Sequence, residues 1–457
     1  MDRERLYGYL PIVLQNVACS LEGWRINRER YDADFDECLS AACARALLSS
    51  DEVCAYRDAR LRAFLQWSVD TVPYYEKLFR KLGAHPMEFT SLDDLNRLPV
   101  LTKRQVQDNP AEFVSKGVRR HERVIAHTSG STGGGLRFAT TKAAIQEQFA
   151  VSWRYLGWYG FTRDRWRAYF GGRSIVPARQ MRPPFWRYNV PGKQILFSGY
   201  HLSEQNLPYY VETLNERRPS WLIGYPSSIA ALAEYLLGTN ASLAYALKGI
   251  ALCSENLMPR HADAIERAFG IRPVQDYGQA EAVANMSQCL HGNLHVDEDF
   301  AAVEFIPVDA DGTTCRVIGT NVSNLATPLI RYDTGDLVTV SGARCGCGRP
   351  GRVVDAIDGR GEDCVVLRNG TKIGRMDHVF KDLVNVREAQ LYQKTRGAIE
   401  VRVVKGPRYG AGDEARLMSE MRKRVGEETD IRVVYVDRIA RTSRGKLRFV
   451  ISDIPRG

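Results

Sequence analysis

The feature that most constrains the fold is an alternation of short apolar runs and amphipathic segments between residues 125 and 357. The apolar runs have the length of strands, and the amphipathic segments have the length and spacing of helices. We expect strands at 166–170, 221–223 and 249–253 and helices at 203–215, 227–237 and 260–269. Strand and helix in alternation predict an α/β fold with parallel sheets flanked by helices.

Two further regions flank this unit. Residues 1–120 are expected to be a helical lead-in, because 41–48 and 59–72 carry apolar residues at three-to-four spacing. After residue 359 the pattern becomes strand, strand, strand, helix, strand, at 364–367, 390–393, 399–404, 414–425 and 431–436. We therefore predict a large N-terminal domain, 1–358, and a small mobile α+β C-terminal domain, 359–457. The charged, glycine-flanked segment between them is expected to let the small domain rotate as a body.

Composition narrows the class of protein. The chain has 457 residues, of which 44% are hydrophobic and 26% charged, and its formal net charge is +9. The basic residues are spread along the chain, so we expect a site for an anionic ligand and no nucleic-acid partner. No apolar run approaches the roughly 18 residues that span a bilayer, and the first ten residues do not form a secretory signal. We expect a cytoplasmic protein with no membrane partner.

A glycine-rich stretch, HTSGSTGGG, occupies residues 127–135 directly after the apolar run 124–126. A strand that ends in hydroxyls and glycines presents backbone N–H groups and Ser/Thr oxygens with little bulk, which suits a multiply charged phosphate. The alternative is a flexible Gly/Ser loop, and the composition of the stretch does not separate the two. A nucleotide is the first hypothesis for its ligand.

The second motif is DYGQAE at 276–281, after the strand-like run 271–274. Tyr277 offers an aromatic face to a nucleobase, Gly278 lets the chain approach a ligand, and Glu281 can hold a magnesium ion. A turn with a packed aromatic residue is the alternative. The third motif, RYDTGD at 331–336, reads as a polar turn in which Asp336 can accept both hydroxyls of a ribose, or as a β-turn with an Asx-type cap.

Two charged motifs follow, DGRGED at 358–363 and RTSRGKLR at 441–448. Lys446, on a glycine-bearing loop, is a mobile point charge that can reach a carboxylate and a phosphate together. Taken alone, each segment is equally consistent with a solvated surface. Five signals in this order are nevertheless difficult to attribute to chance.

Together these motifs resemble the adenylate-forming (ANL) superfamily of acyl-CoA synthetases, adenylation domains and luciferases. The chain looks most like its phenylacetate-CoA ligase branch, which includes the related proteins of the CapK type. The resemblance implies that a carboxylate attacks the α-phosphate of ATP, pyrophosphate leaves, and a second nucleophile takes the acyl group from the acyl-adenylate. In this family the small domain swings between an adenylating pose and a thioester-forming pose.

The resemblance also implies roles for individual residues. Tyr277 would stack on adenine with Gly278 beside it, Asp336 would bind the ribose, and Arg360 would contact ribose or phosphate. Glu281 would place magnesium (Mg2+) and the carboxylate, Lys446 would be the adenylation lysine, and Glu362 would mark the hinge. The phosphate loop would consist of Thr128, Ser129, Gly130, Ser131, Thr132 and Gly133, and the adenine pocket would include Ser254 and Glu255.

Two departures from the family pattern are visible. The phosphate loop of the family usually carries a lysine and a proline after its TG pair, where this chain has Gly134 and Gly135. The last motif of the family often begins with proline, where this chain has Ala440 before Arg441. Neither change removes a group that adenylation requires, but a loop without lysine is expected to bind pyrophosphate more loosely.

Four residues predict a structural zinc (Zn2+) site. Cys289 and His295 stand six apart in CLHGNLH, and Cys345 and Cys347 stand two apart in RCGCGR. Three thiolates and one imidazole make a closed tetrahedral set. His291 competes for the fourth place, and a similar arrangement in the phenylacetate-CoA ligase branch favours His295. Four unrelated reduced residues are the alternative.

The sequence leaves the substrate open. Aromatic residues from 153 to 200, including Trp158, Tyr159 and Phe170, with Tyr225 beyond them, suit either an aromatic acid pocket or core packing. Arg173 suits either an anionic group of the substrate or a surface salt bridge. We expect a small-molecule carboxylic acid and coenzyme A or another acyl acceptor. The competing functions are an adenylyltransferase that leaves AMP on a hydroxyl and a non-catalytic nucleotide-binding protein.

Overall fold

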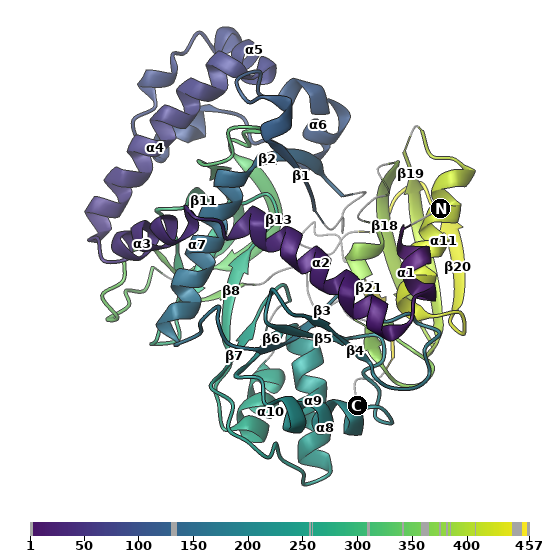
Figure 1. Ribbon diagram of the computed structural model, residues 1–457. Coiled ribbons are helices and arrows are strands. Elements are labelled where there is room, and N and C mark those ends of the chain that lie inside the picture. Colours follow the sequence, from purple (N-terminus) through teal and green to yellow (C-terminus); the bar gives the residue numbers. More distant parts are fainter. Residues whose placement is uncertain are drawn as a thin grey trace.

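The computed structural model describes residues 3–128, 135–255, 257, 259–308, 311–340, 342–357, 365–373, 376–380, 383, 385–406, 408–440 and 450–454. Within these residues the chain forms a helical N-terminal region, a central nine-stranded sheet, a four-stranded antiparallel sheet and a separate C-terminal unit (Figure 1). The expected α/β class, with a large domain of parallel strands and a small α+β domain, is confirmed.

Helices make up the N-terminal region, as expected from its apolar spacing. The Ser49 hydroxyl accepts from the Glu52 N–H, and the Glu52 carboxylate accepts from the Ser49 N–H, so α4 begins with a capping box. Helices α4 and α5 pack their apolar sides against Ala302, Val322 and Ile330 of the main body. The helices are α1 (Arg3–Tyr9), α2 (Ile12–Arg30), α3 (Phe35–Arg45), α4 (Ser50–Thr71), α5 (Pro73–Leu82) and α6 (Lys103–Asp108), with the 3-10 turns η1 (Pro86–Glu88), η2 (Asp93–Arg97), η3 (Pro110–Phe113) and η4 (Arg120–Glu122).

The nine-stranded sheet has the strand order β14-β10-β9-β8-β7-β6-β3-β5-β4. Its middle strands, β5, β3, β6, β7 and β8, run parallel, and the strands on either side of them are antiparallel. The strands are β3 (Arg167–Gly171), β4 (Trp186–Asn189), β5 (Gln194–Ser198), β6 (Trp221–Gly224), β7 (Gly249–Leu252), β8 (Val274–Gly278), β9 (Asn285–Gln288), β10 (Leu294–Val296) and β14 (Val353–Val354).

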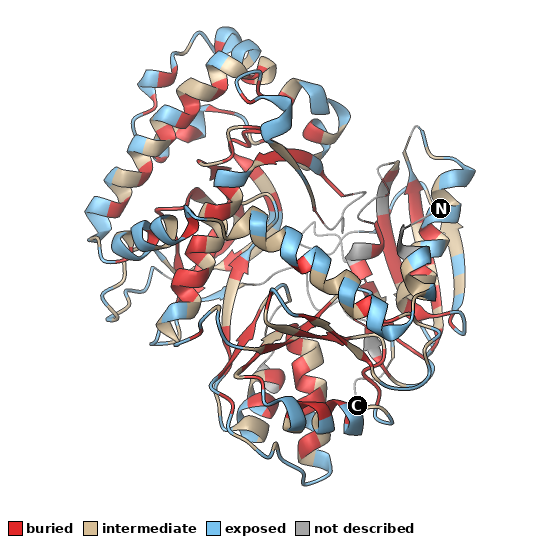
Figure 2. Ribbon diagram, in the orientation of Figure 1, coloured by how far each residue is buried: buried red, intermediate tan, exposed pale blue. Residues whose placement is uncertain are grey.

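Burial explains why these strands read as continuous apolar runs. All four residues of β7 are buried, as expected for a parallel strand covered on both faces. Helices α8, α9 and α10 turn buried sides toward the sheet and exposed sides to solvent (Figure 2), and their core is packed around Phe170, Phe197 and Leu222. The helices of this domain are α7 (Lys142–Trp158), α8 (Leu207–Arg217), α9 (Pro226–Gly238) and α10 (Pro259–Phe269).

Two antiparallel units complete the large domain. The hairpin of β1 (Arg123–His127) and β2 (Arg137–Thr141) flanks the glycine-rich stretch. The four-stranded sheet has the order β11-β12-β13-β15, formed by β11 (Ala301–Pro307), β12 (Thr314–Asn321), β13 (Tyr332–Thr339) and β15 (Ala356–Ile357). Residues 332–336 of the RYDTGD motif therefore lie on strand β13, where the Gly335 N–H donates to Asp333 Oδ1 at 3.0 Å as in the Asx-type turn that the sequence left open. The register against β12 shifts between Arg316 and Ile318, and Gly335 opposite this irregularity has a φ of 73°, which favours glycine.

The C-terminal unit has its own hydrophobic core, built around Phe380, Leu391, Val401 and Met421. The strands and the helix lie where the sequence predicted them, with the parallel pairs β19–β20 and β18–β21 added to the β18–β19 hairpin. The elements are β16 (Val365–Val366), β17 (Lys372–Ile373), η5 (Met376–Phe380), β18 (Val386–Gln393), β19 (Ala398–Lys405), α11 (Ala411–Val425), β20 (Asp430–Tyr435) and β21 (Val450–Ser452). The proposed boundary at 358/359 lies outside the described residues.

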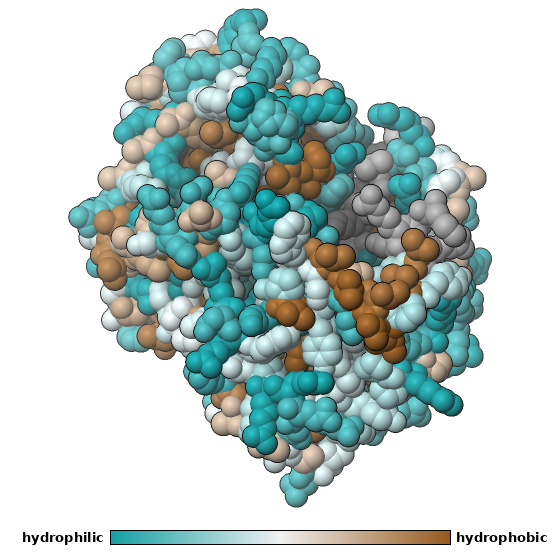
Figure 3. All heavy atoms as spheres, in the orientation of Figure 1, coloured by the Kyte–Doolittle hydropathy of each residue, from teal (hydrophilic) through white to brown (hydrophobic). Residues whose placement is uncertain are grey.

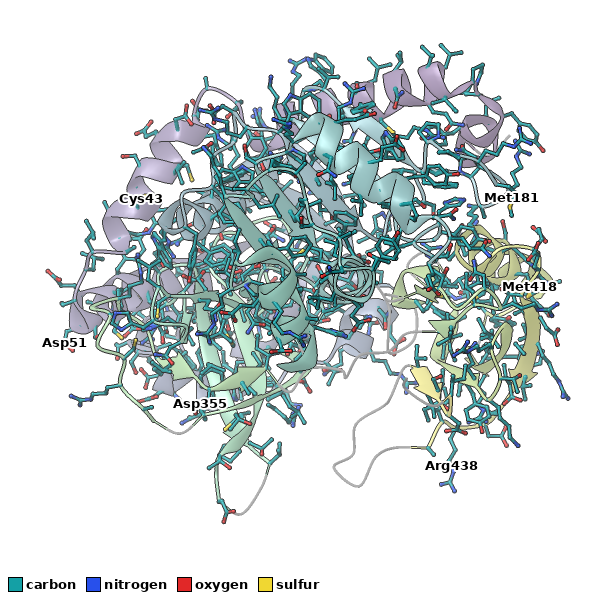
Figure 4. The ribbon with its side chains drawn as sticks, turned by 90° about the horizontal axis from the view of Figure 1, so that it is seen from below. Cys43, Asp51, Met181, Asp355, Met418 and Arg438 are labelled. Atoms are coloured by element: carbon teal, nitrogen blue, oxygen red, sulfur yellow. The ribbon has the colours of Figure 1, made fainter. Side chains whose placement is uncertain are left out.

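Within the described residues, contacts between the C-terminal unit and the large domain include a backbone hydrogen bond and an aromatic side chain. The N–H of Gly135 donates to the carbonyl of Phe380 at 3.1 Å, which joins the end of the glycine-rich stretch to η5. Tyr200 packs against the core of the C-terminal unit. Figure 4 shows the same proximity from below, with Met181 of the large domain and Met418 of the C-terminal unit on one side of the molecule.

Helix α2 runs across the front of the molecule from α3 toward the C-terminal unit (Figure 1). Its outer face leaves Val13, Val17, Leu21 and Trp24 exposed, and Figure 3 shows the apolar surface along this helix. Within the described residues, no helix combines the length and the apolar run that crossing a bilayer requires.

Candidate functional site

A cavity of about 2420 Å³ brings the separate sequence motifs together. It lies between the β1–β2 hairpin, the ends of the parallel strands, helix α2 and the C-terminal unit. The expected site residues that line it are Thr128, Ser254, Glu255, Tyr277, Gly278, Glu281 and Asp336. The ends of parallel strands in an α/β sheet are the usual place for a ligand, so the location alone supports a binding site.

Tyr277 and Asp336 are in direct contact. The Tyr277 hydroxyl donates to Asp336 Oδ2 at 2.9 Å and accepts from Gln279 Nε2 at 2.7 Å. Burial, and then the carboxylate of Asp336, raise the pKa of Tyr277 well above its ordinary value. The phenol therefore stays protonated and remains a donor at neutral pH. The two bonds fix the Tyr277 hydroxyl at the cavity wall.

A second phenol joins the same two motifs. The Tyr332 hydroxyl donates to Glu281 Oε1 at 3.2 Å, and the carbonyl of Glu281 accepts from Asn321 Nδ2 at 3.0 Å. Both partners of this contact are motif residues, but Tyr332 and Gln279 were not predicted as site residues. The sequence feature that could have identified these two residues is their position inside the YGQAE and RYDTGD motifs.

Thr128 closes the base of the glycine-rich loop. Its N–H donates to the Leu136 carbonyl and its hydroxyl accepts from the Leu136 N–H, both at 2.9 Å, and the residue is 4% exposed. This pairing extends the β1–β2 hairpin by one step. The hydroxyl that was expected to contact phosphate is therefore engaged with the backbone.

Ser254 and Glu255 follow strand β7 at the cavity wall. Ser254 is exposed and has a φ of 69°. Glu255 Oε2 accepts from the Ser227 N–H at 3.2 Å, at the start of α9, where a carboxylate is stabilised by the helix N-terminus. Glu255 therefore fixes the turn that carries Ser254.

Asp276 is a cavity residue that the sequence analysis did not single out for chemistry. Burial, followed by the nearby charge of Asp297, raises the pKa of Asp276 from 3.8 to about 7. The carboxylate of Asp297 forms an ion pair with Arg154, whose Nη2 lies 2.7 Å from Oδ1. The Ser287 hydroxyl donates to Oδ2 of the same carboxylate at 2.7 Å. The neutral form of Asp276 is thus populated near neutral pH beside Tyr277.

Several expected site residues lie outside the described residues. They are Ser129, Gly130, Ser131, Thr132 and Gly133 of the glycine-rich loop, Arg360 and Glu362 of the DGRGED segment, and Lys446 near the C-terminus. Their roles stay predictions from the sequence.

The aromatic residues named for the acid pocket divide into two groups. Tyr225 lines the cavity. Phe170 is buried in the sheet core and Tyr159 donates to the carbonyl of Cys289 at 2.7 Å, while Trp158 faces the guanidinium of Arg349. These last three are used in packing, which is the alternative that the sequence left open.

The four expected metal ligands converge on one point. The ligand atoms of Cys289, His295, Cys345 and Cys347 all lie within 4.8 Å of one another. Cys289 follows β9 and His295 lies on β10, which pairs with β14, whereas the two remaining cysteines lie on the segment that precedes β14. His291 does not belong to the group, so the choice of His295 agrees with the geometry.

Two distances within this cluster are close to those of a tetrahedral zinc site. Zn–S bonds of about 2.3 Å place two thiolates about 3.8 Å apart, and a thiolate and an imidazole nitrogen about 3.5 Å apart. The Sγ atoms of Cys289 and Cys345 are 3.7 Å apart, and Cys347 Sγ is 3.4 Å from His295 Nε2. Asn293 Nδ2 donates to Cys345 Sγ at 3.1 Å, as a group that orients a metal ligand does.

Comparison with known protein families and curated proteins gives consistent matches. Residues 365–453 match the CapK C-terminal domain. Protein CapK of Staphylococcus aureus is 26% identical over 457 residues, which cover 98% of this chain and 99% of that protein. The phenylacetate-coenzyme A ligase of Escherichia coli (strain K12) is 27% identical over 336 residues, covering 70% of this chain and 74% of the relative.

Solved structures agree on the fold. A 2-hydroxyisobutyryl-CoA ligase in complex with 2-HIB-AMP and CoA, in the thioesterification state, matches with a TM-score of 0.57 and 19% identity, covering 90% of this chain and 91% of that chain. The same ligase in the postadenylation state, with 2-HIB-AMP, gives a TM-score of 0.54. Together the relatives and the fold confirm the resemblance that the motifs carried.

Proposed function

Because the chain belongs to the adenylate-forming superfamily, in the branch of CapK and the phenylacetate-CoA ligases, we propose that it is an ATP-dependent acid ligase that forms AMP. The carboxylate of a small acid attacks the α-phosphorus of ATP, the bond to the β-phosphate breaks, and pyrophosphate leaves. Coenzyme A or another nucleophile then attacks the acyl carbon of the acyl-adenylate, and AMP leaves.

The observation that carries this proposal is the pair of phenol contacts in the cavity. Tyr277 donates to Asp336 and Tyr332 donates to Glu281, so two distant motifs form one wall. On this wall the Tyr277 ring would hold adenine and Asp336 would accept the ribose hydroxyls. A chain that only packed its core would not need two carboxylates at the surface of one large cavity.

The remaining groups complete the assignment. Thr128 and Leu136 hold the base of the glycine-rich loop, whose N–H groups would contact the triphosphate. Glu281 would help to hold Mg2+, which neutralises charge on the phosphates. Lys446 would stabilise the developing negative charge between carboxylate and phosphate, a role worth on the order of 3 kcal/mol.

We also propose that the cluster of Cys289, His295, Cys345 and Cys347 binds Zn2+ and acts as a structural clamp. It would pin the segment before β14 to the end of the β9–β10 hairpin, and β9 pairs with β8, which carries Tyr277. Zinc here would support the adenine wall without contacting substrate.

Product analysis tests the proposal against its alternatives. The purified protein is incubated with ATP, Mg2+ and a panel of aryl, amino and hydroxy acids, each with and without coenzyme A. An acid ligase releases pyrophosphate and forms an acyl-adenylate, and with a competent acceptor such as coenzyme A it also releases AMP and yields an acyl product that contains no AMP. An adenylyltransferase leaves the mass of AMP on a hydroxyl compound, and a nucleotide-binding protein consumes no ATP.

A further inference from the structure

Two arginines from distant parts of the chain line the same cavity. Arg30 ends helix α2, and Arg173 follows strand β3 after Gly171 and Gly172. Burial lowers the pKa of Arg30, and the positive charge of Arg173 contributes to that lowering. Two cations are thus held near each other at a surface that a ligand can reach.

Arg30 has an aromatic partner and, among the described residues, no acidic one. Its guanidinium carbon lies 4.0 Å from the centroid of the Phe149 ring, and Phe149 also lines the cavity. The Tyr31 side chain also favours the charged form of Arg30. These two partners, which are neutral at neutral pH, compensate only part of the hydration that a buried cation loses. A further anion is therefore the missing partner.

Another arginine of α2, Arg25, differs from Arg30 in having acidic partners. Arg25 forms ion pairs with Glu22 at 2.7 Å and with Glu29, so the carboxylates nearest to this part of the cavity rim are already paired. Among the residues that the structure describes, neither Arg30 nor Arg173 forms an ion pair. The charges of Arg173 and Arg30 help to lower the pKa of Glu22, after the larger effect of its hydrogen bond with Arg25. Glu22 therefore offsets part of the positive charge of this region without forming an ion pair with either arginine.

A third arginine, Arg167, is buried near Arg30. Arg167, on β3, is 8% exposed, and its Nη1 has no hydrogen-bond partner within the described part of the chain. Its guanidinium lies 5.5 Å from the centroid of the Trp153 ring, and the charge of Arg30 helps to lower its pKa after the larger effect of burial. The positive potential is thus strongest at the inner side of this region, where solvent screens it least.

This region adjoins the wall on which the adenylate would form. Phe149 is preceded on α7 by Gln148, whose Nε2 donates to the Gln279 carbonyl of YGQAE at 2.9 Å. Gly172, which precedes Arg173, packs closely against Tyr225 of the cavity lining, because a Cβ on Gly172 would lie 2.6 Å from the Tyr225 hydroxyl. The two arginines therefore line the same cavity as the YGQAE segment.

We propose that the acid which this site activates carries a second anionic group, a carboxylate or a phosphate, that Arg30 and Arg173 bind. This inference rests on the proposed ligase function and names the substrate class of that site. One carboxylate of the acid faces the α-phosphate of ATP, and the second anionic group stays ionised and unreacted at the arginines. The pair thus selects diacids and phosphorylated acids over neutral acids of the same shape.

Matched pairs of acids test the proposal by acid-dependent exchange of labelled pyrophosphate into ATP. The probes are glutarate and its monomethyl ester, terephthalate and its monomethyl ester, and phosphoserine and serine. We expect at least one charged member to support exchange with a kcat/KM at least about 10-fold above that of its neutral partner. The carboxylate and phosphate pairs distinguish the two kinds of second anion.

Variants identify the residues. Arg30→Met and Arg173→Met should raise the KM for the charged acid at least about 10-fold and leave the KM for ATP within about twofold. Arg28→Met is the matched control, because Arg28 is an exposed arginine of the same helix that does not line the cavity. Arg173→Glu should reduce the preference for the charged acid further than Arg173→Met does.

Three results would overturn the inference. Exchange with neutral acids equal to that with charged ones would contradict it while leaving the ligase function intact. A rise in the KM for ATP alone would assign the arginines to the nucleotide. As a readout independent of catalysis, the Tm of the parent protein and of Arg30→Met is measured with glutarate, terephthalate or phosphoserine. If none of these acids raises the Tm of the parent in a way that Arg30→Met abolishes, and no acid supports exchange, both the inference and the ligase function are rejected. A rise that Arg30→Met removes, without exchange, would support the anion site and reject only the ligase function.

Discussion

The hydroxyl of Tyr277 lies 2.9 Å from Oδ2 of Asp336, and this contact joins two different sheets. Tyr277 lies on β8 of the nine-stranded sheet, and Asp336 lies on β13 of the antiparallel sheet. The contact therefore depends on how the two sheets pack, and it places an aromatic ring and a carboxylate side by side at the cavity wall.

Tyr277→Phe tests the value of this contact. The ring remains, but Asp336 loses a donor, which is worth about 1 kcal/mol. We expect the KM for ATP to rise by roughly fivefold. Asp336→Asn should raise it further, because the acceptor for the ribose hydroxyls is weakened. Tyr332→Phe is the matched control, since it removes the other phenol and should affect kcat more than the KM for ATP. Equal effects of the two phenylalanine variants on that KM would contradict the assignment.

Zinc content and stability test the proposed clamp. Elemental analysis of the purified protein should find about one zinc per chain. Cys347→Ser should lose the metal and lower Tm by at least about 5 °C, because a metal ligand contributes several kcal/mol. Cys43→Ser, a change at an exposed cysteine outside the cluster, should alter neither value. Protein without zinc whose Tm is unchanged in Cys347→Ser would exclude the site.

Asp276 predicts a pH dependence of stability. Its pKa rises from 3.8 in the unfolded chain to about 7 in the folded one, so the folded state binds the proton more tightly. Its contribution to the free energy of unfolding is therefore largest at low pH and is lost as the pH rises from 3.8 to about 7. Asp276→Asn cannot ionise and should gain Tm relative to the parent at pH 8, by at least about 2 °C more than at pH 5. A gain that is the same at both pH values would show that Asp276 titrates normally.

Gly426 tests the contact between the two domains. A Cβ at this position would lie 2.0 Å from the hydroxyl of Tyr200, and its φ of 76° disfavours other residues. Gly426→Ala should disturb the docking of the C-terminal unit seen here, so pyrophosphate exchange and transfer to the acceptor should change unequally. Gly410→Ala, where a Cβ meets nothing within 4 Å, is the control. Equal changes in both half-reactions would indicate a general loss of folding.

The local features of the fold were predictable from the sequence. The apolar run of β7 and the amphipathic spacing of α9 and α10 reflect contacts that each element makes with the sheet core. The CxC pair, with Cys289 and His295, predicted a group of four side chains whose ligand atoms lie within 4.8 Å of one another, and the family resemblance selected His295 over His291. The confirmed family resemblance came from motifs of the same kind.

Long-range packing was not predictable in the same way. The pairing of Tyr332 with Glu281 depends on the approach of β13 to the segment after β8, which no local pattern specifies. The RYDTGD motif was expected on a turn; residues 332–336 lie on β13, but 334–336 form an irregularity that does not pair with β12 and that contains an Asx-type bond from the Gly335 N–H to Asp333 Oδ1. The position of Arg30 in the cavity follows from α2 crossing the molecule, whereas its sequence suggested only part of a helical lead-in.

The most direct test of the central claim is acid-dependent exchange of labelled pyrophosphate into ATP, measured on the parent protein and on Glu281→Gln, Lys446→Ala and Glu266→Gln. We predict that at least one acid supports exchange by the parent protein. Glu281→Gln and Lys446→Ala should each reduce it about 100-fold or more. Glu266→Gln, a change at an exposed position on α10, should retain it. A protein that binds ATP but shows no exchange with any acid, or exchange that survives in both Glu281→Gln and Lys446→Ala, would contradict the account.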